Sequence, residues 1–214
     1  MRSGGSQIVK ALDPLYPRIS TPLTHRNPFQ LLIATILSAQ CTDAQVNRVT
    51  PALFERYPDS RSMACAKVRD LERLIKSTGF FRVKSRRIKE IARRIEHDFD
   101  GRVPDTMEGL TSLPGVGRKT ANIVLSAGFE KVEGIAVDTH VKRLSMRIGL
   151  SKNTDPEKIE KDLMEITPRH MWPRLSLLLI LHGRRVCFAR SPNCQACVLR
   201  SRCKYFNGQL GVRG

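Results

Sequence analysis

Lys119 is the residue whose type and position point most directly to covalent chemistry. It follows the glycine-rich stretch Leu-Pro-Gly-Val-Gly-Arg and falls in the first turn of a predicted helix over residues 118–127. The positive end of that helix and partial burial both lower the pKa of an amine, and an uncharged amine can attack a sugar carbon and form a Schiff base. Contact with a phosphate needs only the positive charge. The residues alone leave both roles open.

Asp138 is the second candidate for chemistry. It lies between the apolar run Gly-Ile-Ala-Val and a predicted helix over residues 138–148, which is the position of an N-cap. A capping carboxylate is rigidly aimed. If it faces Lys119, it can stabilise positive charge developing on a sugar or help to move a proton. The capping role and the chemical role are compatible.

Four cysteines near the C-terminus form the pattern C-x6-C-x2-C-x5-C, at Cys187, Cys194, Cys197 and Cys203. Four thiolates can hold zinc or an iron–sulfur cluster. Zinc ribbons usually present two close cysteine pairs, whereas this pattern has one, so the spacing favours iron–sulfur. The surrounding segment is too polar to bury four thiols as core. The remaining two, Cys41 and Cys65, are interpreted as packed or incidental thiols.

The elements around Lys119 are predicted from proline and glycine. Pro114 ends a helix over residues 106–112, because proline lacks the amide donor. Gly115 and Gly117 then permit a tight turn. The second helix follows, with Gly128 as its stop. The backbone amides at the hairpin and in the first turn of the second helix have no partner within these elements, so they can donate to a phosphate oxygen.

A turn at residues 79–84, Gly-Phe-Phe-Arg-Val-Lys, combines aromatic and basic side chains. One interpretation is a hydrophobic clasp under a loop. The other is that a phenylalanine such as Phe80 enters a base stack while cations such as Lys84 hold phosphates. This sequence favours neither.

The chain of 214 residues carries 37 Lys and Arg against 20 Asp and Glu, a formal charge of +17. This excess favours a polyanionic partner, and no long basic amphipathic helix supports a membrane surface instead. Residues 1–10 lack the apolar core of a secretion signal, and no apolar run reaches the roughly 18 residues of a membrane span. We therefore expect a cytoplasmic protein.

The pattern of apolar residues predicts an all-α fold without strands. Asn27 and Pro28 predict the N-cap and first turn of a central helix, which is apolar nearly all round. Besides those named above, helices are expected over residues 29–39, 44–57, 68–77, 84–98, 156–166 and 174–183.

Together these residues resemble the endonuclease III family of base-excision DNA glycosylases, within the helix-hairpin-helix superfamily. The matching segments are Leu-Pro-Gly-Val-Gly-Arg-Lys-Thr-Ala, Val-Asp-Thr-His-Val, Leu-His-Gly-Arg, the four-cysteine loop and Leu-Ser-Ala-Gln-Cys-Thr-Asp around Gln40. The resemblance extends from residue 27 to residue 205. It implies a bifunctional glycosylase and apurinic/apyrimidinic (AP) lyase that removes oxidised pyrimidines from damaged double-stranded DNA and cleaves 3′ to the abasic site.

The resemblance also implies roles for single residues. Lys119 is the nucleophile, Asp138 is its partner carboxylate, and the four cysteines hold a [4Fe–4S] cluster. Gln40 fills the space of the extruded base and Phe80 wedges against the opposite strand. The other expected DNA contacts are Lys84, Gly115, Val116, Gly117, Arg118, His140 and Arg184, with a monovalent cation at the hairpin.

Two helical domains flanking a cleft are implied as well. The first, residues 22–131, is a helical barrel with the helix-hairpin-helix at about 106–127. The second joins residues 1–21 to 132–214 and includes the cluster loop, 187–203. We expect a monomer, associated with the nucleoid in a prokaryote. The rival interpretations are a monofunctional mismatch glycosylase, which uses activated water and lacks the lysine, and an inert DNA-binding module with structural zinc.

Overall fold

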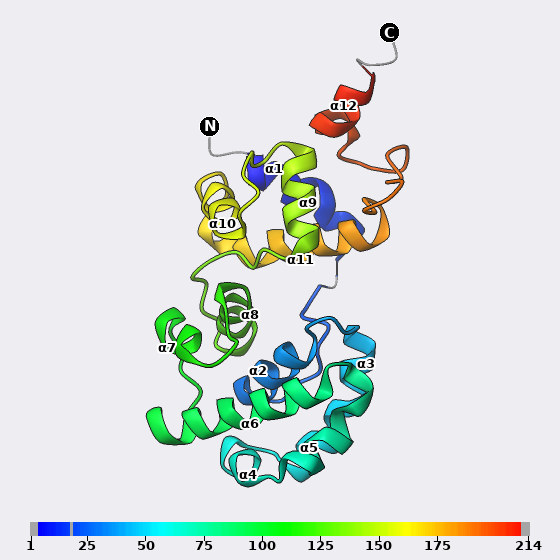
Figure 1. The fold of residues 1–214 in the computed structure, drawn as a ribbon. Coiled ribbons are helices and arrows are strands. Elements are labelled where there is room, and N and C mark those ends of the chain that lie inside the picture. Colours follow the sequence, from blue (N-terminus) through cyan, green and yellow to red (C-terminus); the bar gives the residue numbers. More distant parts are fainter. Residues whose placement is uncertain (1–3, 18, 211–214) are drawn as a thin grey trace. The chain divides into compact units, whose positions relative to one another are not determined.

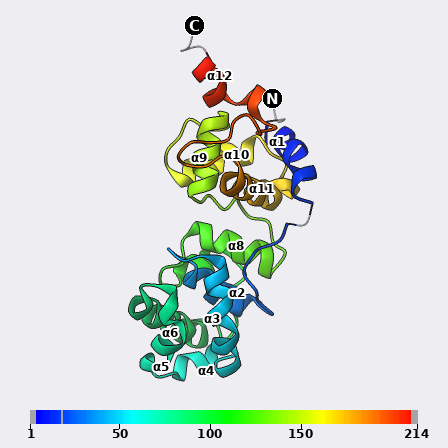
Figure 2. The same ribbon diagram turned by 90° about the vertical axis from the view of Figure 1, so that its right-hand side faces the viewer.

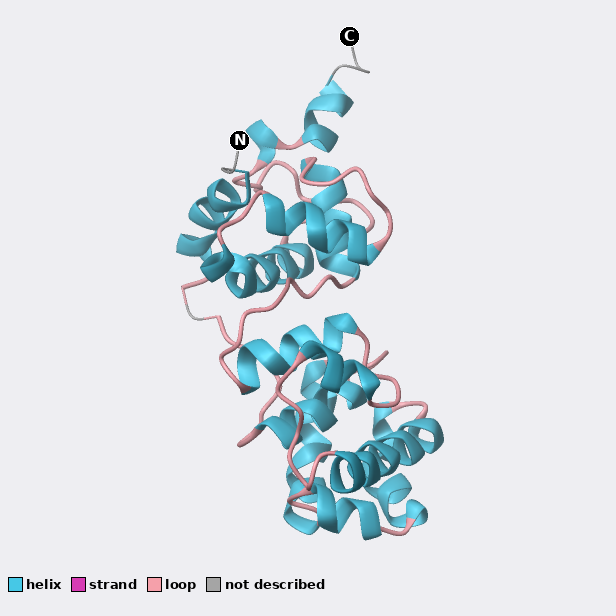
Figure 3. Ribbon diagram, turned by 90° about the vertical axis from the view of Figure 1, so that its left-hand side faces the viewer, coloured by secondary structure: helices cyan, strands magenta, loops and turns pink. Residues whose placement is uncertain are grey.

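The structure is a computed structural model that describes residues 4–17 and 19–210. These residues form twelve α-helices and four short 3-10 helices, with no strand among them (Figure 3). The all-α prediction is confirmed. The chain divides into two compact units, Thr21–Lys131 and the described part of Met1–Ser20 with Val132–Gly214 (Figures 1 and 2).

The unit Thr21–Lys131 is built around two helices, α2 and α6. Its elements are α2 (Pro28–Leu37), α3 (Asp43–Arg56), α4 (Ser60–Cys65), α5 (Val68–Ile75), η2 (Lys76–Thr78), α6 (Phe81–Asp98), α7 (Met107–Ser112) and α8 (Arg118–Gly128). The long α6 packs against α2, α4 and α5, while α8 packs on α2 and α7. The glycine hairpin and Lys119 therefore stand on helices that are anchored in this core.

Helix α2 is the centre of this core. The Asn27 side chain accepts a hydrogen bond from the Gln30 amide, and Pro28 occupies the first turn, as predicted. Every residue from 29 to 37 is buried, which confirms that an apolar surface nearly all round marks a central helix. Helix α8 includes Gly128 and so ends one residue later than predicted, and the Phe129 amide still donates to the Leu125 carbonyl at 3.2 Å.

The other unit has a separate core. Its elements are α1 (Gly4–Leu12), η1 (Asp13–Leu15), α9 (Thr139–Ile148), α10 (Pro156–Glu165), η3 (Arg169–Met171), α11 (Trp172–Arg185), η4 (Arg200–Arg202) and α12 (Lys204–Leu210). Helix α11 packs against α9 and α1, and α12 packs against α9 (Figure 1). This arrangement brings the start of α9, where Asp138 lies, next to the end of α11.

Three helices were not predicted: α1, α4 and α12. Helix α1 lies mostly within residues 1–10, which lack the apolar core of a secretion signal, but Ile8, Val9 and Leu12 share one buried face. The six-residue α4 is too short for a periodic pattern, and a capping box between Asp59 and Ser62 begins it. Within the described part of the chain, no helix combines the length and apolar composition that crossing a membrane requires.

Candidate active site and metal centre

The glycine hairpin between α7 and α8 is a tight turn with a buried anchor. Gly115 has φ +74°, in the left-handed region, and the Val116 amide donates to the Leu113 carbonyl at 3.1 Å. Val116 and Leu113 are buried, whereas Gly115 and Gly117 are exposed. The apolar side chains thus hold the turn in the core while its glycine backbone faces outward.

Lys119 lies in the first turn of α8, as predicted, but it is exposed, so the partial burial expected of its amine from the sequence is wrong for this structure. Gly117 is the N-cap residue of this helix, and a glycine has no side chain with which to accept from the first amides. The helix start can therefore offer its amides to an anion, with the amine of Lys119 beside them. Arg118, which precedes Lys119, is half-buried.

Asp138 is the N-cap of α9, as predicted. Its Oδ1 accepts from the amides of His140 and Val141, both at 2.8 Å. Both bonds use Oδ1, so the cap does not require Oδ2. The run before it is buried, and the Ser176 hydroxyl of α11 donates to the Ala136 carbonyl at 2.7 Å. The half-buried carboxylate is thus fixed by its bonds to the two amides that follow it and by the anchored backbone that precedes it.

His140 and Arg184 lie together where α9 meets the end of α11. A Cβ added at Gly183 would stand 2.9 Å from His140 Nδ1, so only a glycine lets the two helices approach this closely. Arg143 Nη2 lies 3.1 Å from His140 Nδ1 and donates to the Gly183 carbonyl at 3.0 Å. Burial lowers the pKa of His140, and the charges of Arg143 and Arg184 lower it further, while the negative charge of Asp138 opposes this shift.

Gln40 and Phe80 share an unusual backbone conformation. Gln40 has φ 52° and Phe80 has φ 45°, the left-handed region that residues other than glycine rarely adopt. Both side chains are exposed, Phe80 at 65%. Phe80 therefore does not form the hydrophobic clasp that was one interpretation of this turn, whereas its neighbour Phe81 is partly buried and packs against the core of this unit.

The expectation that Lys84 contacts DNA is wrong for this structure. Only 5% of Lys84 is exposed, and its Nζ donates to the carbonyls of Leu37 and Thr78, both at 2.8 Å. Burial lowers the pKa of the amine. Charge and proximity to Phe80 suggested a surface cation, but the first turn of α6 directs this side chain inward to two carbonyls.

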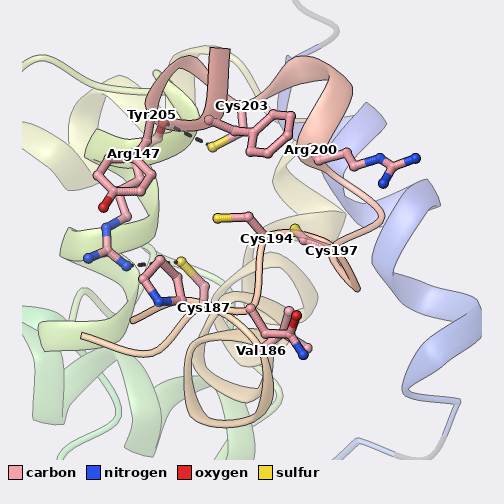
Figure 4. A pocket seen from close by; sticks show the side chains of 11 residues that line it. Arg147, Val186, Cys187, Cys194, Cys197, Arg200, Cys203 and Tyr205 are labelled. Atoms are coloured by element: carbon pink, nitrogen blue, oxygen red, sulfur yellow. Dashed lines mark hydrogen bonds between the residues drawn. The ribbon is translucent and has the colours of Figure 1, made fainter. Parts of the chain in front are cut away.

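The four cysteines line one cavity, together with Arg147, Val186 and Tyr205 (Figure 4). The sulfurs of Cys187, Cys194 and Cys203 turn toward a shared space, with Cys197 at its side. Among the described residues, no three His, Cys, Asp or Glu side chains are grouped as a site for one metal ion. Burial and the neighbouring thiols raise the pKa of Cys194, because thiolates crowded together repel one another. A positively charged group among the four sulfurs would relieve that repulsion, which is the chemistry of an iron–sulfur centre.

Two further side chains contact these sulfurs. Arg147 Nη1 donates to Cys187 Sγ at 3.4 Å and to the Phe188 carbonyl at 2.7 Å, and its guanidinium lies over the Tyr205 ring. His182 Nε2 lies 3.2 Å from Cys197 Sγ, while its Nδ1 lies 3.3 Å from the Tyr16 hydroxyl. Burial lowers the pKa of His182 to about 4, so the ring is neutral near pH 7. Outer contacts of this kind orient the ligands of metal centres.

Sequence reasoning did not identify Arg87, Arg147 or His182 as site residues. The guanidinium of Arg87, on α6, lies against Gly115 of the hairpin. The segment Leu-His-Gly-Arg did contain His182, but no local signal indicated that its ring meets Cys197. All three contacts join residues at least 15 positions apart.

The chain is similar to known DNA repair proteins. Residues 33–169 match the model of the HhH-GPD superfamily of base excision DNA repair proteins. Endonuclease III of Synechocystis sp. is 52% identical over 198 residues, which cover 92% of this chain and 90% of that protein. Endonuclease III of Bacillus subtilis is 44% identical, covering 90% and 88%. A solved structure of a trapped endonuclease III–DNA covalent intermediate superposes with a TM-score of 0.90 at 40% identity, covering 96% of this chain and 98% of that one.

The chain belongs to the endonuclease III family. Its activity is that of a base-excision repair DNA glycosylase with AP lyase activity, and its partner is DNA. The rival interpretations, a monofunctional glycosylase and an inert DNA-binding module, are therefore set aside. The cysteines near the C-terminus are consistent with the iron–sulfur cluster that the spacing favoured.

Proposed function

We propose that this enzyme removes oxidised pyrimidines from duplex DNA and cleaves the strand 3′ to the lesion, with Lys119 as nucleophile and Asp138 as the assisting carboxylate. The observation that supports this assignment most directly is the exposed amine of Lys119 at the uncapped start of α8, beside the outward-facing glycine hairpin. A phosphate at the hairpin would bring the adjoining sugar to the amine.

In the proposed reaction the uncharged Lys119 Nζ attacks C1′ of a flipped-out nucleotide. The bond from C1′ to the base breaks, and the base leaves with the electron pair and takes up a proton. The sugar ring opens to a Schiff base between C1′ and Nζ. Loss of a proton from C2′ then expels the 3′ phosphate by β-elimination, and water releases the amine.

Asp138 would act where charge develops. The sugar becomes positively charged as the base leaves, and a carboxylate stabilises that charge. It can also accept or return the proton that moves during Schiff-base formation. Because Oδ1 is held by two amides, Oδ2 is the oxygen we assign to this work.

The remaining contacts would bind the duplex. The backbone at Gly115, Val116 and Gly117, with Arg118 and a monovalent cation, would hold a phosphate. His140 and Arg184 would contact phosphates at the start of α9 and the end of α11. Gln40 would fill the space of the extruded base and Phe80 would wedge into the opposite strand, since both are exposed.

We propose that the enzyme acts as a monomer on the genome, in the cytoplasm and at the nucleoid in a prokaryote.

We further propose that the four cysteines hold a [4Fe–4S] cluster whose role is to shape the segment 187–203. When bound, the cluster supplies positive charge that stabilises the four thiolates. Iron and acid-labile sulfide assays should find about four of each per protein, the composition of such a cluster. Zinc in their place would contradict this assignment.

Borohydride trapping tests the nucleophile. The reductant converts a Schiff base to a stable amine, so a covalent complex with abasic DNA is expected for the unmodified enzyme and for Lys152→Ala, which removes an equal charge at an exposed position. Lys119→Ala should give none. Undiminished trapping by Lys119→Ala would reject the assignment.

Duplexes carrying thymine glycol, uracil or an adenine mismatch test the lesion class, and only thymine glycol should be removed.

A further inference from the structure

One buried amine joins the two loops that carry Gln40 and Phe80. Lys84 Nζ donates to the carbonyl of Leu37, the last residue of α2, and to that of Thr78, the last residue of η2. Both distances are 2.8 Å, and Leu37 lies 47 positions from Lys84 in sequence. Lys84 itself is in the first turn of α6, so a single side chain connects three elements.

Both carbonyls are at helix ends, where the next turn supplies no amide. In a continuing helix the Leu37 carbonyl would accept from the Cys41 amide, but that amide donates to the Ser38 carbonyl instead. An ammonium donor therefore replaces the missing amide of α2. Charge-assisted bonds of this kind are stronger than those between neutral groups, and more so away from water.

The residues that follow these two carbonyls are in strained conformations. Gln40 lies three positions after Leu37 and Phe80 two positions after Thr78, and both have positive φ. Such conformations persist in residues other than glycine only where the surrounding structure imposes them. The bonds from Lys84 are placed to impose both at once.

A second bond joins the same region from outside. Gln45 Nε2, in the first turn of α3, donates to Ser77 Oγ of η2 at 2.6 Å in an exposed position. The turn that bears Gln40 leads directly into α3, so this bond also ties the Gln40 loop to the Phe80 loop. We call Lys84 and the Gln45–Ser77 pair the brace.

We propose that the brace is a positioning device, with Lys84 as its main member, that holds Gln40 and Phe80 at a fixed separation so that both enter the duplex at one lesion. The proposal rests on the roles proposed above for these two side chains. Lys84 then contributes to recognition without touching DNA. Because duplex DNA must be opened and an already unpaired site need not be, the brace matters for the duplex alone.

The decisive measurement is base unstacking, which does not require the nucleophile. In a Lys119→Ala background, the fluorescence of 2-aminopurine placed opposite an abasic-site analogue reports insertion into the duplex. Lys84→Met removes the ammonium but keeps a long apolar side chain. We expect it to lower the rate of the fluorescence rise about 10- to 100-fold, the cost of misplacing a group by about 1 Å. Lys89→Met, on the same helix, removes the same charge and should leave the rate unchanged.

Trapping on a single-stranded abasic oligonucleotide separates this proposal from the proposed function. With Lys119 present, Lys84→Met should trap the single strand as the unmodified enzyme does and trap the duplex more slowly. Equal loss on both substrates, or loss on neither, would overturn the brace. If the unmodified enzyme traps nothing, the nucleophile assignment fails, and the fluorescence assay still decides the brace.

Two further variants address a Lys84→Met protein that does not fold. Gln45→Ala removes the outer bond at an exposed site, and it should slow insertion into the duplex while leaving single-strand trapping unchanged. Phe80→Ala tests whether the brace acts through Phe80. Phe80→Ala should lower the rate of insertion into the duplex much less in a Gln45→Ala background than in the unmodified enzyme, since both variants affect one step. Fully additive losses would contradict the proposal.

Discussion

Asp138 shows how one side chain can carry a structural and a chemical task. Oδ1 accepts both amides at the start of α9, while Oδ2 is not needed for the cap. The cap was predictable from sequence, because an aspartate before a helical pattern is a local signal. Lys84 illustrates the opposite case, since its two acceptors lie on other elements.

The two tasks of Asp138 can be separated by substitution. Asp138→Asn keeps an oxygen for the cap, so the free energy of unfolding should change little, while base removal should slow by about 10²- to 10⁴-fold with loss of the charge. Asp138→Ala should lose the same activity and, in addition, about 1 kcal/mol of stability. Urea denaturation and single-turnover kinetics measure the two effects. Normal turnover by Asp138→Asn would count against the chemical role.

At the scale of elements, the hairpin between α7 and α8 depends on two glycines for different reasons. Gly115 has φ +74°, and a Cβ there would stand 2.6 Å from Arg87 Nε. Gly117 has φ −96°, and a Cβ there would meet no atom within 4 Å. The sequence pattern does not distinguish the two glycines. In the structure, Gly115 is required for its positive φ, whereas Gly117 leaves the backbone open to a ligand.

A matched pair of alanine variants follows from this difference. Gly115→Ala should lower the free energy of unfolding by about 1–3 kcal/mol, because alanine is strained at positive φ and Arg87 must move. Gly117→Ala should cost less, about 0.5 kcal/mol, because an N-cap favours glycine over alanine. It should weaken DNA binding, since a methyl group would stand between the backbone and a phosphate. Urea denaturation and fluorescence anisotropy with abasic duplex make the comparison. Equal destabilisation by both would contradict the distinction.

At the scale of the whole molecule, a charge of +17 accompanies two separate cores, one in each compact unit. The charge does not specify the fold, but it sets the dependence of DNA binding on salt, because bound phosphates release their counterions. Binding should therefore weaken linearly with salt on logarithmic axes.

Arg184 lies exposed at the end of α11, beside His140. If it contacts one phosphate, Arg184→Ala should reduce the magnitude of the salt slope by about 1 and weaken binding to all DNA sequences alike. Arg73→Ala removes an equal charge from a side chain paired with Asp70 and should leave the slope unchanged. Anisotropy titrations at several salt concentrations provide the slopes. An unaltered slope for Arg184→Ala would exclude the phosphate contact.

By itself, the sequence determined the features that depend on neighbours along the chain. The caps at Asn27 and Asp138, the buried α2 and the all-α fold follow from local hydrogen-bonding geometry and from the periodicity of apolar residues. The short α4 and the amphipathic α1 were not predicted, since each is too short to show a clear periodicity of apolar residues.

The tertiary structure alone decided which distant groups meet. It buried Lys84 between the ends of α2 and η2, placed Arg87 against Gly115, and set His182 between Tyr16 and Cys197. A charged or polar residue has no fixed preference for surface or interior until its partners are known. The balance between the cost of leaving water and the hydrogen bonds gained is settled only when the helices pack.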